Sequence, residues 1–215
     1  MVSASGVKEP KTGITFDAEA GGLRCVGAGV REKKVAIVNV SVYAVALYVD
    51  ADGCRAWRDG GGEVLSGEAG YEKRVVIELA RSVDSATFVK ALVNAVDPRL
   101  REMATNQATS ENEEGNFMSV VAEAAEKREE AAMDDLETMK DLLGGAGKDL
   151  AKGTRVGLRT GVKGEEGVFI SVGQAGAETY LASHELAVAL MDVYLDDGCV
   201  SPSARDAFRA GIQAL

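Results

Sequence analysis

The first eighty residues alternate short apolar runs with glycines and charged residues. Apolar residues dominate positions 14–18, 23–26, 35–40, 42–49 and 73–80. β-Branched and aromatic residues between turn-forming residues are typical of strands, so each run is expected to form a strand. The polar trio Glu32-Lys33-Lys34 is interpreted as a turn, and residues 51–60 as a short helix or a loop.

The middle of the chain changes to the spacing i, i+3, i+4 that is typical of amphipathic helices. A first helix is expected over residues 86–96, capped by Asp84 or Ser85 and ended by Pro98. A longer helix is expected over residues 111–143, stopped by the glycine pair that follows it. Its many Glu and Lys residues indicate a solvated face.

The last third returns to strands and closes with two helices. Residues 155–160 and 167–172 flank a glycine-bounded turn, which predicts a hairpin, and residues 179–181 can add a third strand. Helices are expected after Ser183 and after Ser201-Pro202. The order of strands, helices, strands and helices predicts an α+β fold, with a largely antiparallel sheet and helices on one face. We expect a single domain over residues 1–215.

Charge and composition narrow the classes of ligand. The net charge of -10 and the pI of about 4.8 argue against a nucleic-acid surface, so an anionic ligand requires a local cation. No apolar run reaches the roughly 18 residues that span a bilayer. Cys25, Cys54 and Cys199 lack metal or redox spacing and are expected to be free thiols. His184 is the sole histidine, so we expect no metal, and we expect no cofactor.

Three segments resemble a known family. The most specific is Gly27-Ala28-Gly29-Val30-Arg31, followed by Val-Tyr-Ala-Val-Ala-Leu-Tyr at 42–48. The others are residues 82–96 and residues 186–202, which end in Val200-Ser201-Pro202. Their order and spacing resemble the chalcone isomerase-fold family, in which a Gly-x-Gly-x-Arg strand end precedes a strand similar to Val-Tyr-Ala-x-Gly-Leu-Tyr. The resemblance implies an open-faced sandwich, in which a layer of helices covers one face of the sheet.

The resemblance leaves three functions open. The branches of the family are chalcone isomerases, fatty-acid-binding proteins, and non-catalytic helpers of flavonoid enzymes. Compared with the enzymes, the chain keeps matches at Arg31 and Asn94 but loses hydroxyl groups. Tyr43 and Val193 stand in place of threonines, and Thr87 or Phe88 stands in place of a tyrosine. Because the enolate of chalcone cyclisation needs placed donors, the chain is expected to be non-catalytic, with chalcone isomerisation as the alternative.

Arg31 and Tyr43 carry the ligand prediction. A guanidinium matches a carboxylate with two parallel hydrogen bonds, and a phenol can add a third. If the two strands pair as a hairpin, both side chains can face one cavity. The alternatives are a surface arginine paired with Glu32 and a tyrosine of the core. The predicted ligand-binding residues are Arg31, Tyr43, Thr87, Phe88, Asn94 and Val193.

The resemblance also carries expectations about partners and location. It implies a long-chain fatty acid as ligand, and we expect a monomer. Plastid relatives imply the chloroplast stroma, with the cytoplasm as the alternative. Residues 1–10 show neither a signal-peptide apolar core nor an Arg-rich transit pattern, and removal of a targeting segment stays open.

Overall fold

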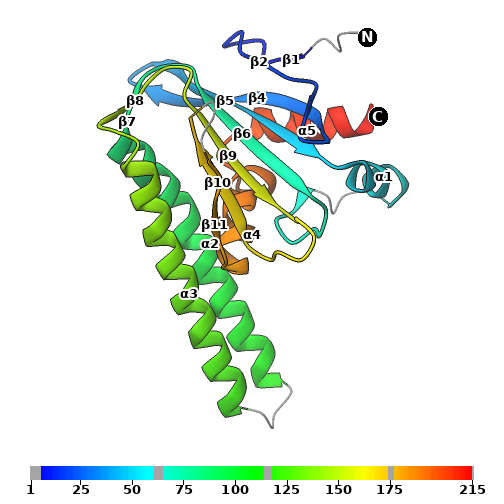
Figure 1. Cartoon of the computed structure of the whole chain (residues 1–215), viewed down its shortest axis with the longest axis vertical. Coiled ribbons are helices and arrows are strands. Elements are labelled where there is room, and N and C mark those ends of the chain that lie inside the picture. Colours follow the sequence, from blue (N-terminus) through cyan, green and yellow to red (C-terminus); the bar gives the residue numbers. More distant parts are fainter. Residues whose placement is uncertain (1–5, 61–64, 114–117, 174–176, 215) are drawn as a thin grey trace.

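A large antiparallel sheet forms the centre of the protein (Figure 1). The computed structural model describes residues 6–60, 65–113, 118–173 and 177–214. Within these ranges seven strands follow the order β11-β10-β9-β6-β5-β4-β3. Their bounds are β3 (Glu19–Ala20), β4 (Leu23–Val35), β5 (Val38–Val49), β6 (Lys73–Leu79), β9 (Arg155–Thr160), β10 (Val168–Val172) and β11 (Thr179–Leu181).

Two short ladders and five helices complete the described part of the chain. The ladders pair β1 (Val7–Lys8) with β2 (Thr15–Phe16) and β7 (Val83–Asp84) with β8 (Asp149–Leu150). The helices are α1 (Ala51–Gly60), α2 (Ser85–Glu113), α3 (Met118–Gly144), α4 (His184–Leu195) and α5 (Pro202–Gln213). None of the described helices is both long and apolar enough to cross a membrane.

The main core lies between the sheet and helices α2 to α5. Its buried side chains come from both layers, for example Val45 and Ile77 from the sheet and Leu136, Leu190 and Phe208 from the helices. A smaller cluster on the opposite face of the sheet packs under the β1–β2 ladder. The predicted α+β fold, an antiparallel sheet with its helical layer on one face, is therefore confirmed.

The β4–β5 hairpin is longer than the sequence predicts. Glu32-Lys33-Lys34, interpreted as a turn, lies within β4 and pairs with β5. The chain reverses instead at Ala36 and Ile37, after the pair Val35–Val38. The prediction was wrong because Ala36 adopts a positive φ of 53°, a conformation in which glycine or asparagine is the usual signal.

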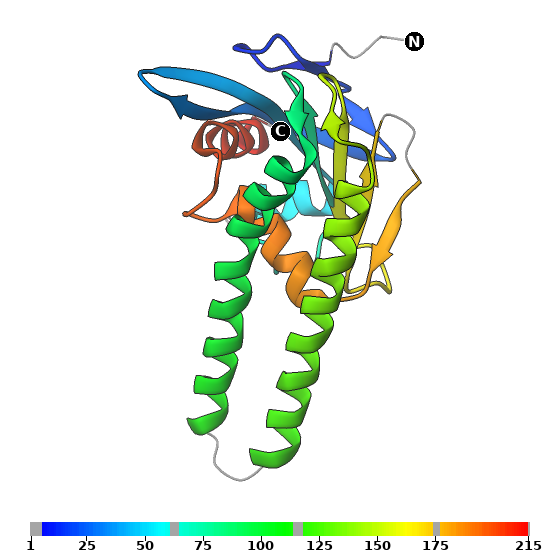
Figure 2. The same cartoon turned by 90° about the vertical axis from the view of Figure 1, so that its left-hand side faces the viewer.

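Helix α2 continues through Pro98, so the predicted end near that residue is wrong. Proline removes one helical hydrogen bond, but the apolar stripe continues beyond it with Leu100 and Met103, which pack against the core. Packing on both sides of the proline therefore keeps the helix intact. Helix α3 ends at Gly144, as predicted, but begins only at Met118. Helices α2 and α3 form an antiparallel pair that extends well beyond the sheet (Figures 1 and 2).

Candidate functional site

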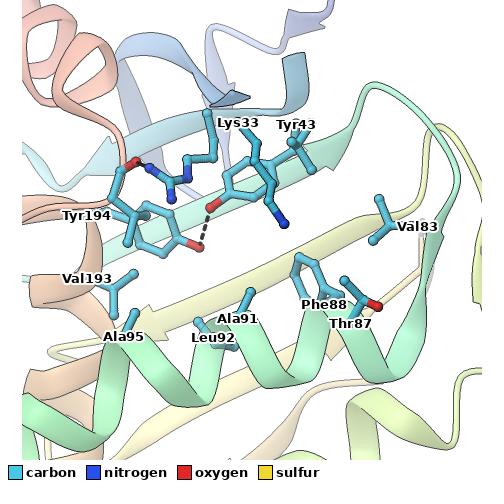
Figure 3. Close-up of a pocket in the computed structure, with 13 residues that line it drawn as sticks. Lys33, Tyr43, Val83, Thr87, Phe88, Ala91, Leu92, Ala95, Val193 and Tyr194 are labelled. Carbon is cyan, nitrogen blue, oxygen red and sulfur yellow. Dashed lines mark hydrogen bonds between the residues drawn. The ribbon is translucent and has the colours of Figure 1, made fainter. Parts of the chain in front are cut away.

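A cavity of about 200 Å³ lies between the β4–β5 hairpin and α2, and α4 closes one side (Figure 3). Its lining residues are Arg31, Lys33, Val42, Tyr43, Val83, Thr87, Phe88, Ala91, Leu92, Ala95, Val193, Tyr194 and Val200. Most of these side chains are apolar, and the polar ones come from β4, β5, α4 and the first turn of α2. The cavity therefore has a largely apolar lining with a few polar groups, the usual composition of a small-molecule site.

Helix α2 forms the floor of this pocket. Thr87, Phe88, Ala91, Leu92 and Ala95 follow the i, i+4, i+8 spacing of one helical face. Figure 3 shows this face turned towards Tyr43 and Tyr194. Because Ala91 and Ala95 have small side chains, they leave space above this face of the helix, and the cavity occupies that space.

The polar wall depends on the pairing of β4 with β5. Arg31 lies directly opposite Tyr43 in the ladder, so the hairpin brings the two predicted ligand contacts side by side. The next pair is Glu32 with Ser41, which leaves Val42 as an extra residue on β5. This bulge allows the consecutive residues Val42 and Tyr43 both to line the pocket.

The segment before α5 holds Arg31 in place. The Nη1 group of Arg31 donates to the carbonyl oxygen of Val200. The Ser201 hydroxyl donates to the carbonyl oxygen of Val30 at 2.8 Å, and Ser203 donates to the same oxygen at 2.9 Å. Two of the segments that carry the family resemblance, residues 27–31 and the end of residues 186–202, therefore meet at Arg31.

Gly27 and Gly29 explain the rest of that motif. A Cβ atom at Gly29 would collide with the backbone of Ala204, and one at Gly27 would lie 2.5 Å from the carbonyl oxygen of Ala207. The glycines therefore let α5 lie directly against β4. In the Gly-x-Gly-x-Arg pattern, the two glycines therefore allow helix packing, and the arginine that follows on the same face of the strand lines the pocket.

Two buried phenols stand beside Arg31. The hydroxyl groups of Tyr43 and Tyr194 are 3.5 Å apart, well beyond the usual 2.7–2.8 Å of such a bond. Burial raises the pKa of Tyr43 and raises that of Tyr194 well above its ordinary value, while the nearby Arg31 charge opposes both shifts. Both phenols therefore stay protonated near neutral pH. Each has an O–H donor that its neighbour uses only weakly.

The charge in the pocket is positive. Arg31 and Lys33 line it, and the lining includes no carboxylate. Among the described residues neither cation has an ion-pair partner within 4.0 Å. Arg31 is half-buried, whereas Lys33 is exposed to solvent. In a protein with net charge -10, the pocket therefore carries a local positive charge.

Five of the six predicted ligand-binding residues line this pocket: Arg31, Tyr43, Thr87, Phe88 and Val193. Their binding role stays a prediction. Asn94 is exposed and does not line the cavity, because it lies about a quarter of a turn from the centre of the pocket-facing stripe of α2.

The sequence interpretation missed Lys33 and Tyr194 as pocket residues. Lys33 was assigned to a turn, although it lies two residues after Arg31 and so shares its face of β4. Tyr194 follows the predicted pocket residue Val193 in α4, and its ring lies in the core. The signal available in the sequence was that Tyr194 directly follows Val193, a predicted pocket residue.

This architecture is the chalcone isomerase-like fold, as the sequence resemblance implied. The crystal structure of the fatty-acid binding protein AtFAP1 of Arabidopsis thaliana superposes with a TM-score of 0.70. The match covers 97% of this chain and 98% of that protein at 18% sequence identity. No protein-family model and no curated protein matches the sequence.

Proposed function

We propose that this protein binds a fatty acid, with the carboxylate beside Arg31 and Tyr43 and the acyl chain over the apolar floor of α2. The observation that supports this most strongly is the half-buried Arg31, which lines a largely apolar pocket and has no carboxylate partner among the described residues. The exposed Lys33 adds a second positive charge to the lining. The likeness to AtFAP1, a fatty-acid binding protein, agrees with that choice of ligand.

The energetics favour an amphiphile over a small anion. Each buried methylene contributes about 0.8 kcal/mol, so ten methylenes give roughly 8 kcal/mol before the costs of ordering. A hydrogen bond to a charged group adds about 1.5–3 kcal/mol. The acyl chain therefore supplies most of the affinity, and the polar wall fixes the direction of the ligand.

The size of the cavity favours a chain of medium length. At about 200 Å³ it is smaller than the roughly 300–1,000 Å³ typical of ligand pockets. A long chain has to displace side chains such as Phe88 or leave its end outside. We therefore expect laurate to bind more tightly than palmitate.

Isothermal titration calorimetry with laurate and dodecanol tests the proposal. The two ligands have the same chain length and differ in charge, so Arg31 should favour laurate by tenfold or more. Equal affinity for the acid and the alcohol, or no saturable binding of laurate, would reject the proposal.

A substitution in the floor tests where the chain lies. Ala91→Leu adds bulk inside the pocket, and the matched change Ala86→Leu adds the same bulk at an exposed position of the same helix outside it. We expect Ala91→Leu to weaken laurate binding by about 1–2 kcal/mol, because the larger side chain fills space that the acyl chain needs, and Ala86→Leu to leave it unchanged. Equal effects of the two changes would place the acyl chain elsewhere.

A further inference from the structure

The tip of the β4–β5 hairpin exposes apolar side chains to solvent. Ile37 is 93% exposed and Val38 is 59% exposed, more than any other large hydrophobic side chain whose position the structure describes. In Figure 2 the hairpin, in blue, extends past helix α5, in red. The tip thus presents two exposed apolar side chains beyond helix α5.

The same end of the sheet carries a local excess of positive charge. Antiparallel pairing places the start of β5, the end of β6 and the start of β9 at this end. The segments that reach this end, residues 33–40, 80–84 and 148–153, contain five cations and two carboxylates, a net charge of 5 - 2 = +3. They are Lys33, Lys34, Arg81, Lys148 and Lys152 against Asp84 and Asp149. The whole chain, by contrast, has net charge -10.

Part of the pocket lining lies near this end of the sheet. Lys33 lines the cavity and lies four residues before Ile37. Val83 and Thr87, from the connection after β6 and the start of α2, line the same side. A ligand that leaves the pocket past Lys33 therefore emerges next to the apolar tip.

We propose that the hairpin tip docks on an anionic lipid bilayer. Ile37 and Val38 enter the headgroup region, and Lys33, Lys34, Arg81 and Lys152 lie near the lipid phosphates. An apolar wedge beside cations is the combination that binds such interfaces, and the remaining acidic surface of the protein disfavours any other approach. The bilayer as a source of the bound acyl chain rests on the proposed function, whereas the docking surface itself does not.

Vesicle co-sedimentation of the full chain tests this surface. The expected result is binding to vesicles of phosphatidylcholine mixed with phosphatidylglycerol, and little binding to phosphatidylcholine alone. Lys34→Gln should weaken binding about fivefold, and Ile37→Ser should weaken it further. The matched control Lys163→Gln changes an exposed lysine in the β9–β10 turn at the opposite end of the sheet and should have no effect.

The outcomes separate the surface from the pocket. Lys34→Gln and Ile37→Ser lie outside the cavity lining, so their laurate affinity in solution should equal that of the wild type. No binding to the anionic vesicles, equal binding to both vesicle types, or equal loss with Lys163→Gln would overturn the docking proposal. Capture of an acidic protein by the tip without vesicle binding would also overturn it. Failure to bind laurate, with vesicle binding intact, would instead reject only the proposed function.

Discussion

Lys73 and Arg31 are cations at two different sites in this protein, and their surroundings differ in kind. Lys73 is 0% exposed, and its ammonium group donates to the carbonyl oxygens of Ser66, Gly67 and Ala69. Arg31 is half-buried and donates to one carbonyl oxygen, that of Val200, beside an open cavity. A cation whose donors are all used by its own chain stabilises the fold, whereas a cation with donors left over towards a pocket is available to a ligand.

Replacing Arg31 is expected to have the largest effect on binding. Arg31→Gln keeps a polar side chain but removes the charge, so laurate affinity should fall by about 1.5–3 kcal/mol. The free energy of unfolding should fall by about 0.5–1.5 kcal/mol, because only the hydrogen bond to the carbonyl oxygen of Val200 is lost and the charge has no ion-pair partner among the described residues. Calorimetry and urea unfolding measure the two quantities. A large loss of stability with unchanged affinity would reverse the assignment of roles.

Replacing Lys73 is expected to do the opposite. Lys73→Met leaves carbonyl oxygens of residues 66–69 without their donor and should lower the free energy of unfolding by about 2 kcal/mol. Laurate affinity should match that of the wild type, since Lys73 does not line the cavity. Weaker laurate binding by a folded Lys73→Met variant would show that the two sites are coupled.

Lys73 also predicts a pH dependence of stability. Burial lowers its pKa from 10.5 to about 8, although Asp192, Glu68 and Asp50 oppose the shift. Between these values the unfolded chain holds a proton that the folded chain has released, so stability rises with pH. Relative to Lys73→Met, the wild type should gain about 1 kcal/mol over the first pH unit above 8. Urea unfolding of both proteins below and within this window checks the slope. A constant difference would show that Lys73 stays charged.

The phenol beside Arg31 should give the smallest change. Tyr43→Phe removes a donor that contacts Tyr194 only at 3.5 Å, so stability should change by less than about 0.5 kcal/mol. Laurate affinity should fall by about 1 kcal/mol. The control is Tyr48→Phe, on the opposite face of the sheet, whose hydroxyl donates to the carbonyl oxygen of Asp17 at 3.0 Å. Tyr48→Phe should lower the free energy of unfolding and leave laurate affinity unchanged. If Tyr48→Phe weakened laurate binding and Tyr43→Phe did not, Tyr43 would not belong to the site.

The fold and half of the polar wall follow from local patterns in the sequence. Strand runs, helix caps such as Ser183 and the Gly-x-Gly-x-Arg segment are local signals, and each of them predicts its element. The turn at Ala36 and the helix through Pro98 do not, because packing and hairpin pairing override the preferences of single residues there. Tyr194 reaches the pocket only through tertiary contacts, from a helix more than 150 residues after Tyr43.

The central claim, a ligand carboxylate held at Arg31, is tested most directly by the pKa of that carboxylate in the complex. Laurate labelled with ¹³C at its carboxyl carbon reports this value by NMR titration. An apolar pocket alone would raise the pKa of the bound acid, whereas the guanidinium should hold it below that of the free acid. The account predicts a lowered value in the wild type and a raised one in Arg31→Gln. A bound carboxylate whose pKa is raised in the wild type, or is the same in both proteins, would contradict it.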